Sequence, residues 1–261
     1  MSIATAPLLV EAPPTVPPRF GLLSVAQIPD TPDLHWADGV EYPTSPRPTA
    51  VTDDIDCDPD DLADLIGDIP WVSDDPVRVW TGVQVKRVGW DEGEVDQHVR
   101  GMLTAGEGPA LERGLWPRLA GASTTLPAGD DPLSILSGVG ALESWLWESY
   151  GGVGVLHVPR SAVGHLVRAE QVREVNGRLQ TPLGTLVSAG AYPGRSPADD
   201  PAAEGAVWVA ATPAVQLRRT PIRVQSSFGH RDNTQMVVAD RVYVPSWENL
   251  SAAAHIQLET P

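Results

Sequence analysis

Short runs of apolar residues, either continuous or alternating with polar ones, recur along most of the chain. Alternation with a period of two places every second side chain on one face of a strand, and short apolar runs bounded by turn residues are typical of buried strands. The runs are Phe20–Gln27, Trp36–Tyr42, Val77–Val88, Val153–Val158, Leu183–Ala189, Ala206–Thr212, Ile222–Gln225, Thr234–Val244 and Ala253–Leu258. We expect Pro245 to close the long run before it, and Asn176-Gly177 to form a turn.

Asp91–Trp116 has helical spacing instead. Its apolar residues lie at positions i, i+4, i+7 and i+8, which form one stripe facing a core. These residues are Val95, Val99, Met102 and Leu103. Acidic residues in the first turn suit the positive end of the helix dipole. Gly106–Pro109 interrupts the pattern, so we expect a break or kink there.

Further helices are predicted at Pro59–Ile66, Pro132–Tyr150 and Ser161–Glu170. In the second of these, one apolar face is flanked by two tryptophans, and glycines follow its end. The face consists of Ile135, Val139, Leu142 and Leu146, with Trp145 and Trp147 beside it. Together with the strands, these segments predict an α+β protein.

The N-terminal segments are expected to need a partner. Met1–Pro18 is rich in proline, which favours an extended arm over a helix, and in isolation such an arm can also be a disordered tail. Phe20–Gln27 and Trp36–Tyr42 are predicted to pair as a two-stranded hairpin across the turn at Pro29–Asp33. Such a hairpin is marginally stable alone, so we expect it to lie on another surface.

The amino-acid composition limits the range of possible functions. The chain has 261 residues, 42% of them hydrophobic, and a net charge of −16, which argues against wrapping by nucleic acid. No apolar run is long enough to span a membrane, and no secretory signal is recognisable. Cys57 is the only cysteine and Lys86 the only lysine, so no internal disulfide can form.

The sequence gives only weak evidence for catalytic or metal-binding residues. Asp54-x-Asp56-x-Asp58 resembles the start of a calcium loop, but Pro59 and Leu65 occupy the positions of its glycine and glutamate. A solvated acidic loop over Asp53–Asp75 is the better interpretation. His157 alternates within an apolar strand and is interpreted as a structural histidine. No nucleophile elbow or phosphate-binding loop is present, so we predict no catalytic residue, no metal site and no cofactor.

The order of elements, together with several local patterns, resembles one known family. A hairpin strand begins Leu183-Gly-Thr-Leu-Val, and Asp232–Arg241 leads into a closing strand pair over Arg241–Ala252. This layout resembles the major capsid proteins of tailed bacteriophages, of the kind found in phages of actinobacteria, a fold shared with encapsulins. The resemblance implies an N-terminal arm, an extended hairpin loop, a peripheral domain with a spine helix, and an axial domain.

The resemblance also suggests boundaries for these parts. They are an arm at 1–19, the hairpin loop at 20–50, the peripheral domain at 51–123, the axial domain at 124–212, and C-terminal strands at 213–261 that complete both domains. In the family the hairpin loop reaches over a neighbouring subunit. Residues predicted to make inter-subunit contacts are therefore Phe20, Leu22, Leu23, Trp36 and Tyr42.

The implied function is structural and not enzymatic. Copies of the chain would form the hexamers and pentamers of an icosahedral head in the host bacterial cytoplasm, enclosing double-stranded DNA without sequence-specific binding. Decoration, scaffold and portal proteins would be further partners, with no membrane involved. An encapsulin-like shell around a cargo enzyme and a minor head protein are alternatives. A soluble hydrolase or ligand-binding domain is the alternative from a different class.

Overall fold

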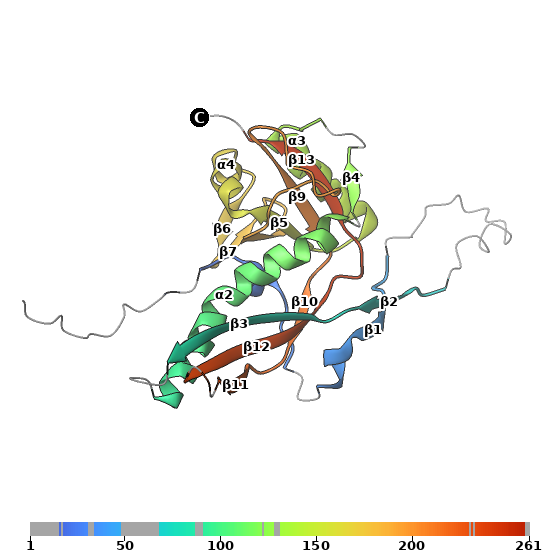
Figure 1. The fold of residues 1–261 in the computed structure, drawn as a ribbon. Helices are drawn as coiled ribbons and strands as arrows, with labels where there is room; N and C mark the ends of the chain where they lie inside the picture. Colours follow the sequence, from blue (N-terminus) through green and yellow to red (C-terminus); the bar gives the residue numbers. More distant parts are fainter. Residues whose placement is uncertain are drawn as a thin grey trace, which may run out of the picture.

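The long helix α2 (Glu92–Gly121) is the element around which this computed structural model is arranged, and it contacts strands of both main sheets (Figure 1). The structure describes residues 16, 18–30, 34–47, 68–86, 91–121, 123–127, 131–229, 231 and 233–258. The expected arm before residue 16, the acidic residues at 53–67 and the helix at Pro59–Ile66 lie outside these residues.

The predicted break at Gly106–Pro109 is wrong, because α2 continues through Pro109 and also contains Pro117. A proline removes one backbone hydrogen bond and crowds the preceding helical turn. Packing outweighs that cost here, since Leu103 and Leu111 on either side of Pro109 are at most 1% exposed.

The stripe predicted for α2 is confirmed at three of its four positions. Val95, Val99 and Leu103 are buried, whereas Met102 is 37% exposed. Leu111 and Leu115, eight and twelve residues after Leu103, continue the buried stripe. The helix therefore presents one apolar side to the core along most of its length.

A four-stranded antiparallel sheet packs on α2. Its strands are β3 (Val77–Lys86), β10 (Gln216–Arg219), β11 (Arg223–Gly229) and β12 (Thr234–Ser246). β12 pairs with all three others. The expected end of β12 before Pro245 is wrong, because the strand continues to Ser246. Pro245 is tolerated because only β10 pairs with β12 there, the pairing with β3 having ended at Tyr243.

The two faces of this sheet differ. Val79, Val237 and Ala239 are buried in the core that contains α2. Trp80 and Met236, on the opposite face, are 64% and 52% exposed. Lys86 is exposed at the end of β3, and the register pairs it with Thr234.

The second large sheet has seven strands in the order β4-β13-β9-β5-β8-β7-β6. They are β4 (Thr124–Leu126), β5 (Val155–Pro159), β6 (Arg173–Val175), β7 (Arg178–Gln180), β8 (Leu186–Gly190), β9 (Ala206–Thr212) and β13 (Ala252–Gln257). Successive residues of β9 face different cores. Trp208 and Ala210 pack in the core with α2, and Val209 and Ala211 pack with α3 (Ile135–Ser149).

The helices on the second face of this sheet follow the predictions closely. α3 buries Ile135, Val139, Leu142 and Leu146 as expected, although it begins at Ile135, after the N-cap Ser134, and not at Pro132. The predicted helix at Ser161–Glu170 is the 3-10 turn η3 (Arg160–Ala162) followed by α4 (Val163–Arg168). The turn at Asn176-Gly177 joins β6 to β7, and both of its residues have positive φ angles.

The predicted pairing of Phe20–Gln27 with Trp36–Tyr42 is wrong. Leu22–Val25 forms the short helix α1, and His35–Asp38 forms the 3-10 helix η1. β1 (Val40–Pro43) pairs instead with β2 (Trp71–Asp74), antiparallel. The first run is short and apolar, and its buried residues Leu22 and Val25 lie three apart, as on one face of a helical turn.

Candidate assembly site

Glu112 on α2 holds two distant chain segments through its carboxylate. Its Oε1 accepts a hydrogen bond of 2.8 Å from the backbone N–H of Leu22, and its Oε2 accepts one of 2.6 Å from the N–H of Ala191. A Cβ atom added at Gly21 or Gly190 would lie 2.5 Å from the glutamate carboxyl group. Both glycines are therefore required for this close approach. Glu112 itself is only 3% exposed.

Arginine side chains complete the surroundings of this carboxylate. Burial raises the pKa of Glu112, while the N–H groups of Ala191 and Leu22 and the charges of Arg160 and Arg113 oppose that rise. Arg160 also donates to the backbone oxygens of Arg19 and Ala189. The segment before α1 is thereby attached to the end of β8, where the N–H of Ala189 also donates to the oxygen of Phe20 at 2.6 Å.

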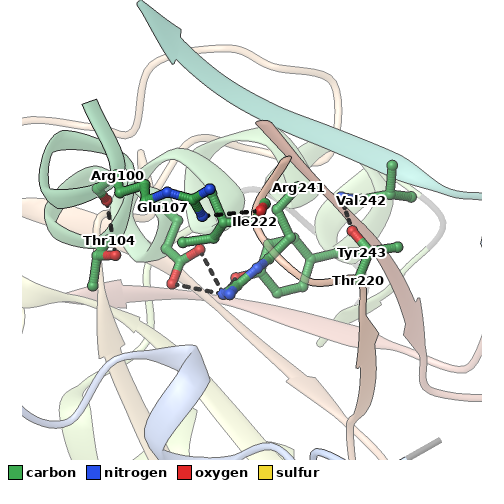
Figure 2. A network of polar contacts seen from close by, with 8 residues as sticks. All are labelled: Arg100, Thr104, Glu107, Thr220, Ile222, Arg241, Val242 and Tyr243. Carbon is green, nitrogen blue, oxygen red and sulfur yellow. Dashed lines mark hydrogen bonds and ion pairs between the residues drawn. The ribbon is translucent and has the colours of Figure 1, made fainter. Parts of the chain in front are cut away.

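A second buried carboxylate joins α2 to the four-stranded sheet. Figure 2 shows Arg241 reaching from β12 to Glu107 on α2, with its Nη1 3.1 and 3.0 Å from the two glutamate oxygens. Nearby, Arg100 donates to the backbone oxygen of Ile222 at 3.2 Å. The long helix is thus attached to the sheet by charged groups as well as by apolar packing.

The base of the β1–β2 pair has its own polar anchor. Asp74, 1% exposed, accepts a 2.7 Å hydrogen bond from the hydroxyl of Tyr42 and forms a 2.9 Å ion pair with Arg118 on α2. The Tyr42 oxygen also accepts the backbone N–H of Glu248 at 2.9 Å. Burial, followed by the hydrogen bond to Asp74, raises the pKa of Tyr42. This anchor fixes the direction in which β1 and β2 leave the body (Figure 1).

The five residues predicted to make inter-subunit contacts do not lie together. Phe20, Leu22 and Leu23 belong to the segment that Glu112 holds, Trp36 lies in η1, and Tyr42 lies in the anchor of β1 and β2. Leu22 is 1% exposed within its own subunit, and Leu23 packs against the same core. Contact with a neighbour stays a prediction, now better suited to the exposed parts of β1 and β2.

His157 is the structural histidine that the sequence predicts. It is fully buried, with Nδ1 3.0 Å from the hydroxyl of Tyr192 and Nε2 2.9 Å from the hydroxyl of Thr212. Thr212 donates its own proton to the oxygen of Pro213, so it accepts from His157 Nε2–H. Nδ1 consequently accepts from Tyr192. Burial lowers the pKa of His157 to about 3, which keeps the ring neutral.

The described part of the chain holds no cluster of three or more acidic, histidine or cysteine side chains that could bind a metal ion. Among the helices of that same part, none is long and apolar enough to cross a membrane.

Sequence reasoning missed the carboxylates that organise these contacts. Glu107 lies four residues from both Leu103 and Leu111, which places it on the apolar stripe of α2. An acidic residue on such a stripe is a signal of a buried partner. Asp74 gave no such signal, because it belongs to a run of aspartates interpreted as a solvated loop.

The arrangement of elements is similar to solved shell proteins. The capsid of an empty GTA particle has a TM-score of 0.57 at 10% identity, over 97% of this chain and 95% of that one. The capsid of Ralstonia phage GP4 has a TM-score of 0.55 at 9% sequence identity, and the match covers 99% of this chain and 97% of that one. The holo-SrpI encapsulin complex from Synechococcus elongatus PCC 7942 has a TM-score of 0.54 at 11% sequence identity, and the match covers 99% of this chain and 94% of that one.

Sequence comparison alone finds no such likeness, since no family model and no curated protein matches the chain. The shared architecture nevertheless covers nearly the whole length of both partners in each structural match. The chain therefore has the tailed-phage major capsid fold, which encapsulins share.

Proposed function

We propose that this protein is the subunit of a closed icosahedral shell, and not an enzyme. The observation that carries the proposal is the match of nearly the whole chain to capsid and encapsulin subunits over nearly their whole length. The anchored β1–β2 pair supports it, because a projecting pair of strands with a rigid base is suited to contact a neighbour. Hexamers and pentamers of identical copies would form the shell.

The content that we favour is double-stranded DNA, which makes the protein the major head protein of a virion assembled in the host bacterial cytoplasm. Phage capsids recur among the similar structures, which supports this choice. The net charge of −16 fits a shell that does not bind tightly to the DNA it encloses. Portal, scaffold and decoration proteins would be its partners.

An encapsulin-like compartment is the second candidate, because the match to the encapsulin subunit covers 99% of this chain with a TM-score close to those of the capsids. The two candidates differ in what the shell contains. Shells isolated from the native source and treated with nuclease should retain protected DNA if the first is right. A co-purifying enzyme without protected DNA would favour the second.

Assembly itself is tested on the purified chain. Light scattering should report particles of megadalton size, and negative-stain microscopy should show rings or shells. The variant Gly114→Ala is a suitable control, since a methyl group there meets nothing within 4 Å and should leave assembly unchanged. A protein that stays monomeric at high concentration across salt and pH contradicts the proposal.

A further inference from the structure

An open groove of about 710 Å³ lies between α3 and the segment that connects β7 to β8. One wall carries Trp147, which is 77% exposed, and the other carries Leu183, which is 78% exposed. Exposed apolar side chains gathered around a groove mark contact surfaces more often than isolated ones do. The sequence placed Trp147 beside the buried face of its helix, whereas the structure leaves it in solvent.

A carboxylate is held in place inside this groove. Glu143 Oε2 accepts a 2.7 Å hydrogen bond from the hydroxyl of Thr185, and its Oε1 accepts one from the hydroxyl of Thr181. An ionised carboxylate offers about four acceptor positions, so two remain for a further donor. Both threonines are buried, so the carboxylate is oriented before any partner arrives.

Glu143 and Trp147 are four residues apart on α3, so they lie next to each other on one face of the helix. A fixed carboxylate beside an accessible indole ring is suited to a guanidinium group. The guanidinium can donate two hydrogen bonds to the carboxylate and stack on the aromatic face, which an ammonium group does less well. The groove therefore has the chemistry of an arginine receptor.

The same chain carries a complementary basic surface. β6 is the outer strand of the seven-stranded sheet, and the β6–β7 hairpin pairs Arg173 with Gln180 and Val175 with Arg178. Directly opposed residues project from the same face, so both arginines lie on one side of the hairpin. Leu179, on the other side, is buried, and both arginines are exposed.

The charges of the two surfaces are opposite. α3 contains Glu143 and Glu148 and no basic residue, whereas the face of the hairpin that carries Arg173 and Arg178 has no acidic residue. Glu174 lies on the other face, opposite Leu179, and forms a 3.0 Å ion pair with Arg19. We propose that the β6–β7 hairpin of a second copy of this chain docks in the groove, with an arginine on Glu143 and against Trp147. Because groove and hairpin are different surfaces, repetition of this contact can close a ring. The inference rests on the proposed shell function and adds the residues of one contact.

The first experiment measures assembly of the full chain by light scattering. Trp147→Ala and Glu143→Gln should each raise the concentration needed for half-maximal assembly at least tenfold, as should Arg173→Glu combined with Arg178→Glu. Leu136→Ala is the matched control, since Leu136 is 64% exposed on the same helix and does not line the groove. Circular dichroism should show unchanged secondary structure in every variant.

The second experiment identifies the occupant. In a Cys57→Ser background, Gly140→Cys in the groove wall combined with Asn176→Cys at the exposed tip of the hairpin leaves Glu143, Trp147 and both arginines in place. This variant should give a ladder of disulfide-linked multimers on oxidation, and either cysteine alone should give none. Wild-type assembly with a fully assembling Trp147→Ala variant and no ladder would overturn this contact and leave the shell function intact. Loss of assembly in Trp147→Ala without a ladder would assign the groove to a different partner element, which also overturns the proposal. Failure of the wild-type chain to assemble under any condition would contradict the proposed shell function, and the proposed contact would then fail with it.

Discussion

Glu112 shows how a single side chain can connect segments that are far apart in the sequence. It accepts the N–H groups of Leu22 and Ala191, and its position depends on glycine at two places where a side chain would collide with it. A buried carboxylate is costly unless its hydrogen bonds are made, so these contacts are maintained together or lost together.

Gly190→Ala should therefore destabilise the subunit by about 1–3 kcal/mol, the usual cost of inserting a methyl group into a packed site. The added Cβ would lie 2.5 Å from Glu112 Cδ and 2.7 Å from Tyr192 Cε2. Urea unfolding measures the change in the free energy of unfolding. Gly114→Ala on α2 is the control and should stabilise by up to about 1 kcal/mol, because alanine favours helix more than glycine does. Equal effects of both variants would refute the steric argument.

His157 should make the stability of the subunit depend on pH. Its pKa falls from 6.5 to about 3 on folding, so the unfolded chain binds more protons between these values. The stabilisation is complete above pH 6.5 and is lost as the pH falls toward 3. Wild type should lose about 2 kcal/mol between pH 7 and pH 5 through this residue alone, at about 1.4 kcal/mol per pH unit.

The control for this effect is His157→Gln, which can keep both hydrogen bonds but does not titrate. The raised pKa of Glu112 acts in the opposite direction, and it acts equally in both proteins. The difference between their urea unfolding curves at pH 7 and pH 5 therefore isolates His157. Parallel pH dependences in the two proteins would show that the ring is not buried in the neutral form.

At the scale of elements, the sequence predicted strands and helices best where one period dominated a long segment. β9 lies where the apolar run placed it, and α3 buries the expected face. The predictions failed where tertiary contacts decide between two local possibilities. The run Leu22–Val25 is as apolar as a strand, and only its contacts with α2 and β8 make it a helical turn.

The hairpin predicted within 20–50 has the wrong strands, because the partner of β1 is β2 at Trp71–Asp74. β1 pairs with β2 across a connection of more than twenty residues, and no local pattern reports a pairing at that separation. The polar anchor at Asp74 was not predictable for the same reason, since its partners come from β1, α2 and the segment after β12. A deletion of Leu22–Tyr42, which the predicted hairpin would tolerate, is now expected to unfold the subunit.

Tyr42→Phe tests the anchor of β1 and β2. The change leaves the N–H of Glu248 without its acceptor and removes one donor from Asp74, so we expect a loss of about 1–2 kcal/mol in stability. The loss should be local, and hydrogen exchange should become faster at β1 and β2 while α3 keeps its protection. Tyr150→Phe is the matched control, because the Tyr150 hydroxyl forms no hydrogen bond with a described residue. Uniformly faster exchange across both sheets would contradict a local anchor.

For the molecule as a whole, the net charge can be read directly from the amino-acid sequence. Each copy carries −16, so copies brought together in a shell repel one another. The opposing possibility is that acidic residues of 53–75, other than the buried Asp74, pair with arginines of a neighbour, such as Arg218, Arg219 or Arg231. Added salt distinguishes repulsion between subunits from attraction between them, because it screens both. Assembly improves with salt if repulsion dominates and weakens if attraction dominates.

We expect repulsion to dominate, so moderate salt should promote assembly by screening it over about 10 Å at 0.1 M. Light scattering during a titration from about 0.05 to about 1 M sodium chloride measures the response. A control titration with an uncharged osmolyte separates screening from general effects on solubility. Steady dissociation of the particles as salt increases would show that attraction between subunits outweighs repulsion.

The position of Lys86 has a practical consequence. It is the only lysine in the chain, is exposed at the end of β3 and does not line the groove beside α3. With any free α-amino group blocked, an amine-reactive dye or a coupled peptide would therefore find one side-chain amine per copy, at one defined place. A particle built from this subunit would display its labels with the symmetry of the particle itself, at a stoichiometry set by the number of copies.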